Sequence, residues 1–150
     1  MRAEILAAVA MVLAVAFAPD ASGAGAHLRV SATVLPRAAL TAVRQVPTVT
    51  VTQRDIERGF VEVASATRFE LTSNTSSQLE VTGGGEWFRA VRVTGLPSAA
   101  LEFPSMARAI AQLPAFITRY AADLSVRFDL APGARPGAYA WPLALSVTPW

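Results

Sequence analysis

Strict alternation of apolar and polar residues is the feature that most constrains the fold of this chain. It is most regular from Leu124 to Leu130, where Ser125, Arg127 and Asp129 separate the apolar positions. A period of two places successive side chains on opposite faces, which is typical of a half-buried β-strand and not of a helix. We therefore predict mainly antiparallel sheet with one buried face.

The alternation recurs at short intervals, and clusters of Asn, Ser, Thr, Gly and Pro separate the segments. Seven to nine short strands of this kind favour an all-β fold, an immunoglobulin-like antiparallel β-sandwich. The predicted strands cover residues 28–34, 48–52, 60–64, 68–73, 79–81, 87–93, 101–103, 124–130 and 139–147.

Two segments lack this alternation. The polar residues 53–58, followed by Gly59, are interpreted as a connection. Residues 105–113 place Met106, Ala109, Ile110 and Leu113 at helical spacing, and Pro114 follows as a stop. A short helix or an irregular crossover is expected there.

The N-terminus predicts export. Arg2 precedes an unbroken apolar run from Ile5 to Phe17, and small residues follow. This order is typical of a secretory signal peptide helix over residues 1–26, with cleavage after Ala24 or Ala26. An uncleaved membrane anchor is the alternative, but the run is shorter than the roughly 17–25 residues that span a bilayer. Residues 27–150 then form a single β-sandwich domain.

Composition excludes several kinds of chemistry. The chain has no cysteine, so disulfides, thiol nucleophiles and thiolate metal sites are ruled out. His27 is the only histidine, which leaves no Ser/His/Asp triad and no Cys/His pair. Carboxylate pairs such as Glu62 with Glu70 fall on the outward face of strands. We expect no catalytic residue, no bound cofactor and no metal site, and hence no enzyme.

The charged residues do not indicate nucleic-acid binding. All 13 basic residues are arginines, the formal net charge is +2, and the arginines are scattered singly along the chain. Nucleic-acid binding requires a clustered basic face. Solvent-facing strand positions explain this pattern better.

The last predicted strand opens with Gly137 and Tyr139 and continues with alternating apolar residues. This stretch resembles the closing strand of chaperone–usher pilus subunits, and is most similar to the group related to spore coat protein U. The closing-strand motif comprises Gly137, Tyr139, Trp141, Leu143, Leu145 and Val147.

This resemblance implies an incomplete sandwich that is completed by a strand from the N-terminal extension of a neighbouring subunit. In this chain the candidates for the donated face are Leu28, Val30, Ala32 and Val34, which lie just behind the predicted cleavage point. The alternative is that these residues form the ordinary first strand of a complete domain.

The expected function is that of an exported, non-enzymatic structural or assembly component of a pilus-type surface appendage. Its partners would be copies of itself or other pilus-type subunits, together with a periplasmic chaperone. Its location would be the periplasm, the cell surface or the medium, with no stable membrane span after cleavage. The alternative is a self-contained periplasmic or secreted binding module for carbohydrate or protein.

Overall fold

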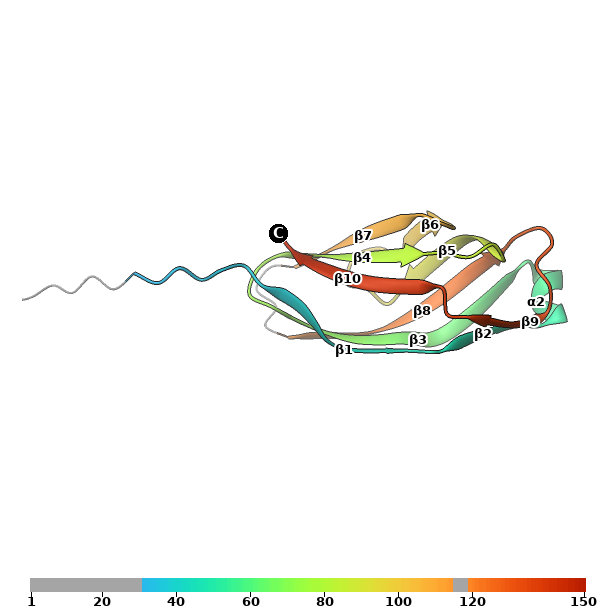
Figure 1. Cartoon of the computed structure of the whole chain (residues 1–150), viewed down its shortest axis with the longest axis horizontal. Helices are drawn as coiled ribbons and strands as arrows, with labels where there is room; N and C mark the ends of the chain where they lie inside the picture. The colour runs from blue at the N-terminus through green and yellow to red at the C-terminus, as the bar shows by residue number, and fades with distance from the viewer. Residues whose placement is uncertain (1–30, 115–118) are drawn as a thin grey trace, which may run out of the picture. The chain divides into compact units, whose positions relative to one another are not determined.

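The computed structural model describes residues 31–114 and 119–150, which contain ten strands and one short helix (Figure 1). The elements are β1 (Ala38–Gln45), β2 (Thr48–Val51), α2 (Gln53–Arg58), β3 (Phe60–Ser73), β4 (Ser77–Gly83), β5 (Phe88–Thr94), β6 (Leu101–Pro104), β7 (Arg108–Leu113), β8 (Tyr120–Leu130), β9 (Gly137–Ala140) and β10 (Leu143–Pro149).

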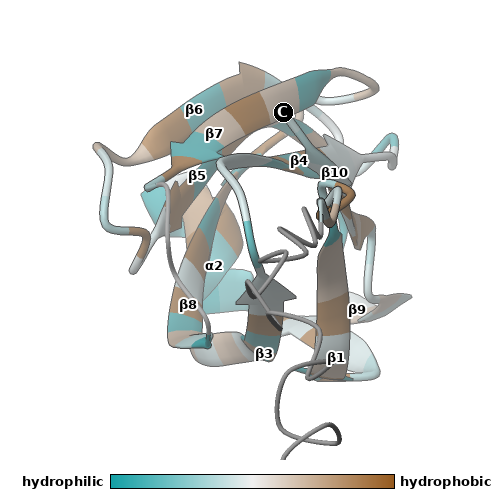
Figure 2. Ribbon diagram, turned by 90° about the vertical axis from the view of Figure 1, so that its left-hand side faces the viewer, coloured by the Kyte–Doolittle hydropathy of each residue, from teal (hydrophilic) through white to brown (hydrophobic). Residues whose placement is uncertain are grey.

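The strands form three antiparallel sheets. Their orders are β1-β3-β8-β5-β6, β10-β4-β7 and β2-β9. Figure 2 looks along the strands and shows β4, β7 and β10 in one layer, opposite β1, β3 and β8. At the two sides of the sandwich, β6 lies beside β7 and β1 lies beside β10. The predicted all-β sandwich is confirmed, with ten strands in the described residues instead of seven to nine.

The core lies between the two layers and uses the alternate positions that the sequence marks as apolar. Every predicted inward residue of β8 is buried, and Phe128 has no exposed surface. Leu79 and Val81 of β4 are equally buried in the opposite layer. The buried β8 positions are Leu124, Val126, Phe128 and Leu130.

Aromatic rings fill one part of this core. The Phe128 ring lies 4.9 Å from Trp87, 5.1 Å from Phe88 and 5.7 Å from Trp141, measured between ring centroids. The Tyr139 ring stacks on Trp87 at 4.9 Å. Such pairs stabilise a fold beyond the area they bury, by about 0.5–1.5 kcal/mol each. Phe128 contacts three of the other rings in this cluster.

The predicted connection at residues 53–58 is the helix α2, which joins β2 to β3 and which the sequence pattern did not predict as a helix. Thr52 caps it: its hydroxyl accepts a hydrogen bond from the Asp55 N–H, and the Asp55 carboxylate accepts one from the Thr52 N–H. Gly59 ends the helix at a φ of +80°, a conformation that favours glycine. These reciprocal caps stabilise a helix too short to show a periodic pattern.

Acid should destabilise the domain partly through Asp55. Hydrogen bonds from Thr52, and then Arg58, hold the pKa of Asp55 below its ordinary value. A lowered folded-state pKa stabilises the protein above the unfolded value of about 3.9, and this stabilisation is lost as the pH falls through the folded value. Asp55→Asn should therefore lower the free energy of unfolding by roughly 1–2 kcal/mol at neutral pH.

Urea unfolding at a series of pH values measures this difference, which should shrink as the solution is acidified. Glu57→Gln is the matched control, since Glu57 is an exposed carboxylate on the same helix. If the Asp55→Asn deficit stays constant down to the lowest pH, the charge of Asp55 does not stabilise the cap.

The two strands predicted over residues 60–64 and 68–73 are one strand, β3, interrupted by a bulge. Its pairing with β8 shifts register between Val63 and Thr67. Ser65 lies in the bulge at a φ of +48°, and its N–H donates to the Ser125 hydroxyl. The extra residues interrupt the alternation, which explains why two segments were predicted.

The short helix predicted near residues 105–113 is wrong. Met106 has a φ of +63° in a tight turn, and β7 follows it. Ala111 and Leu113 point into the core, whereas Ile110 is 46% exposed on the opposite face. The apparent helical spacing therefore came from one turn residue, Met106, together with residues that lie on both faces of β7. β7 pairs with β4 along its whole length.

The predicted closing strand is divided between two sheets. β9 pairs with β2, and after Pro142 the chain continues as β10, which pairs with β4. The Trp141 N–H still donates to the Pro47 carbonyl oxygen. Pro47 separates β1 from β2 in the same way that Pro142 separates β9 from β10. Proline has no N–H to donate to the hydrogen bonds between two strands. Each strand pairing therefore ends at its proline, and there the chain passes from one sheet to another.

Residues 31–37 form no strand, and every one of them is exposed. The described part of the predicted strand 28–34, which contains Ala32 and Val34, therefore forms no ordinary first strand of this domain. Leu28, Val30 and the predicted signal peptide lie outside the described residues. The first strand of the described residues is β1, which the alternation did not predict.

Residues 35–150 form one compact unit, and the β3–β4 turn ties both of its ends. The Asn74 side chain donates to the Leu35 carbonyl oxygen and accepts from the Arg37 N–H. The Trp150 N–H donates to the Ser76 carbonyl oxygen at 2.8 Å. One short turn thus holds the chain where it enters and where it leaves the sandwich.

Candidate functional site

The candidate site is the unpaired edge of β10, which we call the open edge. β10 pairs only with β4, and no strand of the described residues pairs with its other side. The Pro142 carbonyl oxygen and the Trp150 N–H both bond towards β4. Because backbone groups alternate between the two sides of a strand, those of Leu145 and Val147 point to the open edge.

Gln45 occupies one end of the open edge. Its side-chain amide donates a hydrogen bond of 3.2 Å to the Leu143 carbonyl oxygen. The contact confirms that the backbone of Leu143 points away from β4. The contact also gives the Leu143 carbonyl oxygen, the first acceptor on the open edge, a hydrogen-bond partner. The stretch of the open edge that pairs with no strand therefore runs from Leu145 to Pro149.

The inward side chains beside the open edge are incompletely covered. Leu145 and Val147 are half-buried, whereas their cross-strand partners Val81 and Leu79 are at most 1% exposed. The core therefore reaches the surface along β10. A further strand at this edge would cover apolar surface as well as backbone groups.

β1 lies on the same side of the sandwich and is also an edge strand, but it is less suited to pairing. A bulge between Leu40 and Ala42 interrupts its register, and Arg44 adds a charge. Bulges and charges are the usual protection of sheet edges. β10 carries no charged side chain, and only Pro149 at its end blocks pairing. Of these two edges, β10 is therefore the better suited to pairing with an added strand.

The structure divides the predicted closing-strand motif among β9, the switch between the sheets, and β10. Gly137 and Tyr139 belong to β9, where the Tyr139 hydroxyl donates to the Arg135 carbonyl oxygen at 2.7 Å and closes the preceding loop. Trp141 lies at the switch between sheets. Leu143, Leu145 and Val147 share the inward face of β10. Only these last three line the open edge.

Two of the candidate donor residues, Ala32 and Val34, lie in the described part of the chain. Val34 is 76% exposed, as is its neighbour Leu35, and Ala32 is exposed as well. The segment is free of sheet pairing immediately before β1 begins.

Gln45 is the site residue that sequence reasoning missed. Pro36 and Pro47 bracket β1 and could have marked it as a separate element. The bulge places Leu40 and Val43 on the same face, opposite Leu71 and Phe69, at a spacing of three residues. This spacing hides the strand from a search for a period of two.

No group of three His, Cys, Asp or Glu side chains within residues 31–114 and 119–150 is placed to hold a metal ion. The helix found in these ranges is neither long nor apolar enough to cross a membrane. No family model matches the chain, and comparisons with curated proteins and with solved structures found no match.

Proposed function

We propose that this chain is an exported, non-enzymatic assembly subunit that polymerises by strand addition at the open edge. The N-terminal segment of one copy, with Leu28, Val30 and Val34 on its donated face, pairs with β10 of the next. The observation that carries the proposal is that β10 has unpaired backbone groups directly beside half-buried Leu145 and Val147.

The chemistry of the two parts supports this pairing. The acceptor supplies backbone hydrogen-bonding groups and an apolar surface, and the donor supplies alternating apolar residues with exposed Val34. Each Val or Leu side chain that becomes fully buried contributes about 1.5–3 kcal/mol. Three such residues would together contribute roughly 4.5–9 kcal/mol, which offsets much of the roughly 4–15 kcal/mol cost of association, and the backbone hydrogen bonds of the added strand contribute the rest.

Removing residues 28–34 tests the proposal. The chain from residue 27 onward should form polymers that grow with concentration, as measured by light scattering after size-exclusion chromatography. The deleted form should remain monomeric and bind a synthetic peptide of residues 27–36. Its fold should persist, because the compact unit begins at Leu35.

A peptide with Val30 and Val34 both replaced by Asp is the matched control and should not bind. Two results would contradict the proposal: polymers that form equally well without residues 28–34, or a full-length chain that stays monomeric even when concentrated.

A further inference from the structure

Trp150 is a large apolar side chain held on a fixed backbone at the surface, and the open edge does not use it. Its side chain is 71% exposed. Its N–H donates to the Ser76 carbonyl oxygen, and its carbonyl oxygen accepts from the Thr75 hydroxyl at 3.1 Å. The backbone of Trp150 is thus held at both polar groups, and its indole is presented to solvent.

A row of neutral hydrogen-bonding side chains crosses the sheet beside this indole. Gln78 of β4 is aligned with Gln112 of β7 on one side and with Thr148 of β10 on the other. Aligned residues of neighbouring strands share a face. Trp150 follows Thr148 by two residues and so belongs to the same outer face.

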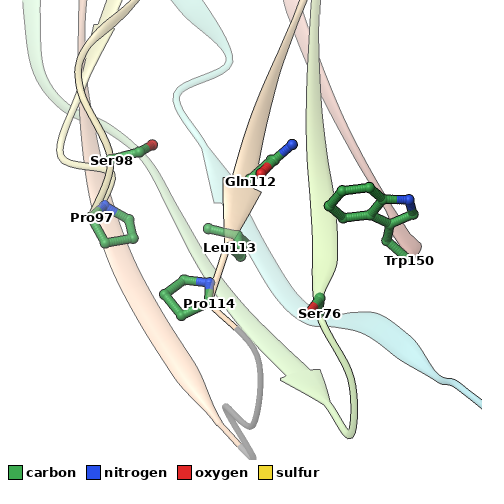
Figure 3. A pocket seen from close by; sticks show the side chains of 7 residues that line it. All are labelled: Ser76, Pro97, Ser98, Gln112, Leu113, Pro114 and Trp150. Carbon is green, nitrogen blue, oxygen red and sulfur yellow. The ribbon is translucent and has the colours of Figure 1, made fainter.

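A hollow of about 370 Å³ connects the indole with one end of this row. In Figure 3, Gln112 and Leu113 lie between Trp150 with Ser76 on one side and Pro97 with Ser98 on the other. The volume falls in the range of roughly 300–1,000 Å³ found for small-molecule sites. Its lining residues are Ser76, Pro97, Ser98, Gln112, Leu113, Pro114 and Trp150.

The lining identifies the class of ligand by its mixture of groups. It has an aromatic face, proline rings, an amide and hydroxyls, but no charged side chain. A charged ligand would find no counter-charge, and a purely apolar ligand would leave the Gln112 amide without a partner. A sugar ring has apolar C–H faces and a rim of neutral hydroxyls, which matches both parts.

We infer that this hollow binds a neutral oligosaccharide, with one ring stacked on Trp150 and its hydroxyls hydrogen-bonded to Gln112 and Ser76. The hollow shares no residue with the open edge: the edge is the side of β10 away from β4, whereas the hollow is lined by β7, the β5–β6 loop and the residues Ser76 and Trp150. Failure of one therefore leaves the other intact.

Titration of the full chain with maltohexaose, cellohexaose and chitohexaose tests the inference. The indole N–H signal of Trp150 in NMR spectra, assigned with Trp150→Phe, should shift with at least one of them. Trp150→Ala should weaken that binding by at least about tenfold, the equivalent of one aromatic contact. Gln112→Ala should weaken it by about fivefold, since a neutral hydrogen bond is lost.

Met106→Ala is the matched control, because Met106 is equally exposed but lies on the β6–β7 turn. It should leave the affinity unchanged. The inference is overturned if none of the three oligosaccharides shifts the Trp150 signal, or if Trp150→Ala binds as tightly as the original chain. Binding of an anionic polysaccharide such as polygalacturonate, without any neutral one, would also overturn it.

Discussion

Replacing Phe128 by alanine is expected to lower the free energy of unfolding by about 3–5 kcal/mol. The Phe128 ring is fully buried in the central strand β8 and contacts Trp87, Phe88 and Trp141. Alanine removes these contacts and leaves a cavity. Because β8 is paired with β3 on one side and β5 on the other, its backbone cannot move in to fill the cavity. The loss is a large part of the roughly 5–15 kcal/mol by which native domains are stable.

Phe60→Ala is the matched control, because it removes the same atoms from a half-buried ring at the start of β3. Phe60 packs beneath the guanidinium of Arg127, 3.8 Å from the ring centroid, and contributes about 1 kcal/mol in this way. The midpoint temperature of thermal unfolding should fall by more than about 10 °C for Phe128→Ala and by far less for Phe60→Ala. Equal losses would mean that Phe128 is not the centre of the core.

Val147→Pro is expected to reduce polymer formation at least about fivefold while leaving the monomer folded. The Val147 N–H points to the open edge and not towards β4, so a proline removes a donor that only an added strand would use. One lost hydrogen bond in a newly buried position costs about 1–3 kcal/mol, which corresponds to roughly a five- to hundredfold loss of affinity.

Two controls separate the backbone from the side chain. Val147→Ala keeps the N–H and should weaken polymer formation less than Val147→Pro. Ser146→Pro removes an N–H that pairs with β4, so it should destabilise the monomer itself. Light scattering measures assembly, and urea unfolding measures stability. If Val147→Ala and Val147→Pro assemble alike, the added strand does not pair with this edge.

The parts of the fold that alternation could predict are the regular strands. β8 and β4 bury every second side chain, and their apolar residues were recognised from the sequence. β6 and β2 were also predicted, although each has only four residues. Alternation with a period of two is enough to predict a strand wherever the strand is uninterrupted and one of its faces is buried.

The remaining elements depend on interactions that a local pattern does not contain. The bulges of β1 and β3 change the period, and the capping box of α2 stabilises a helix of only six residues. The division of the closing strand into β9 and β10 depends on the strand with which each half pairs, β2 for the first and β4 for the second. Leu145 and Val147 were chosen as candidates from the sequence, but the hydrogen bond from Gln45 to β10 joins residues 98 positions apart.

The turn between β3 and β4 has a mechanical consequence. Asn74 holds Leu35 and Arg37, and Ser76 holds Trp150, so both ends of the compact unit leave from the same place. Tension applied between these ends would load the few hydrogen bonds of this turn first and peel the terminal strands one bond at a time. A strand added along β10 whose own subunit lies beyond Leu143, at the opposite end of β10, would instead be pulled along its length, with its hydrogen bonds loaded together. Joined subunits would then resist force better at their junctions than a single subunit does between its own two ends.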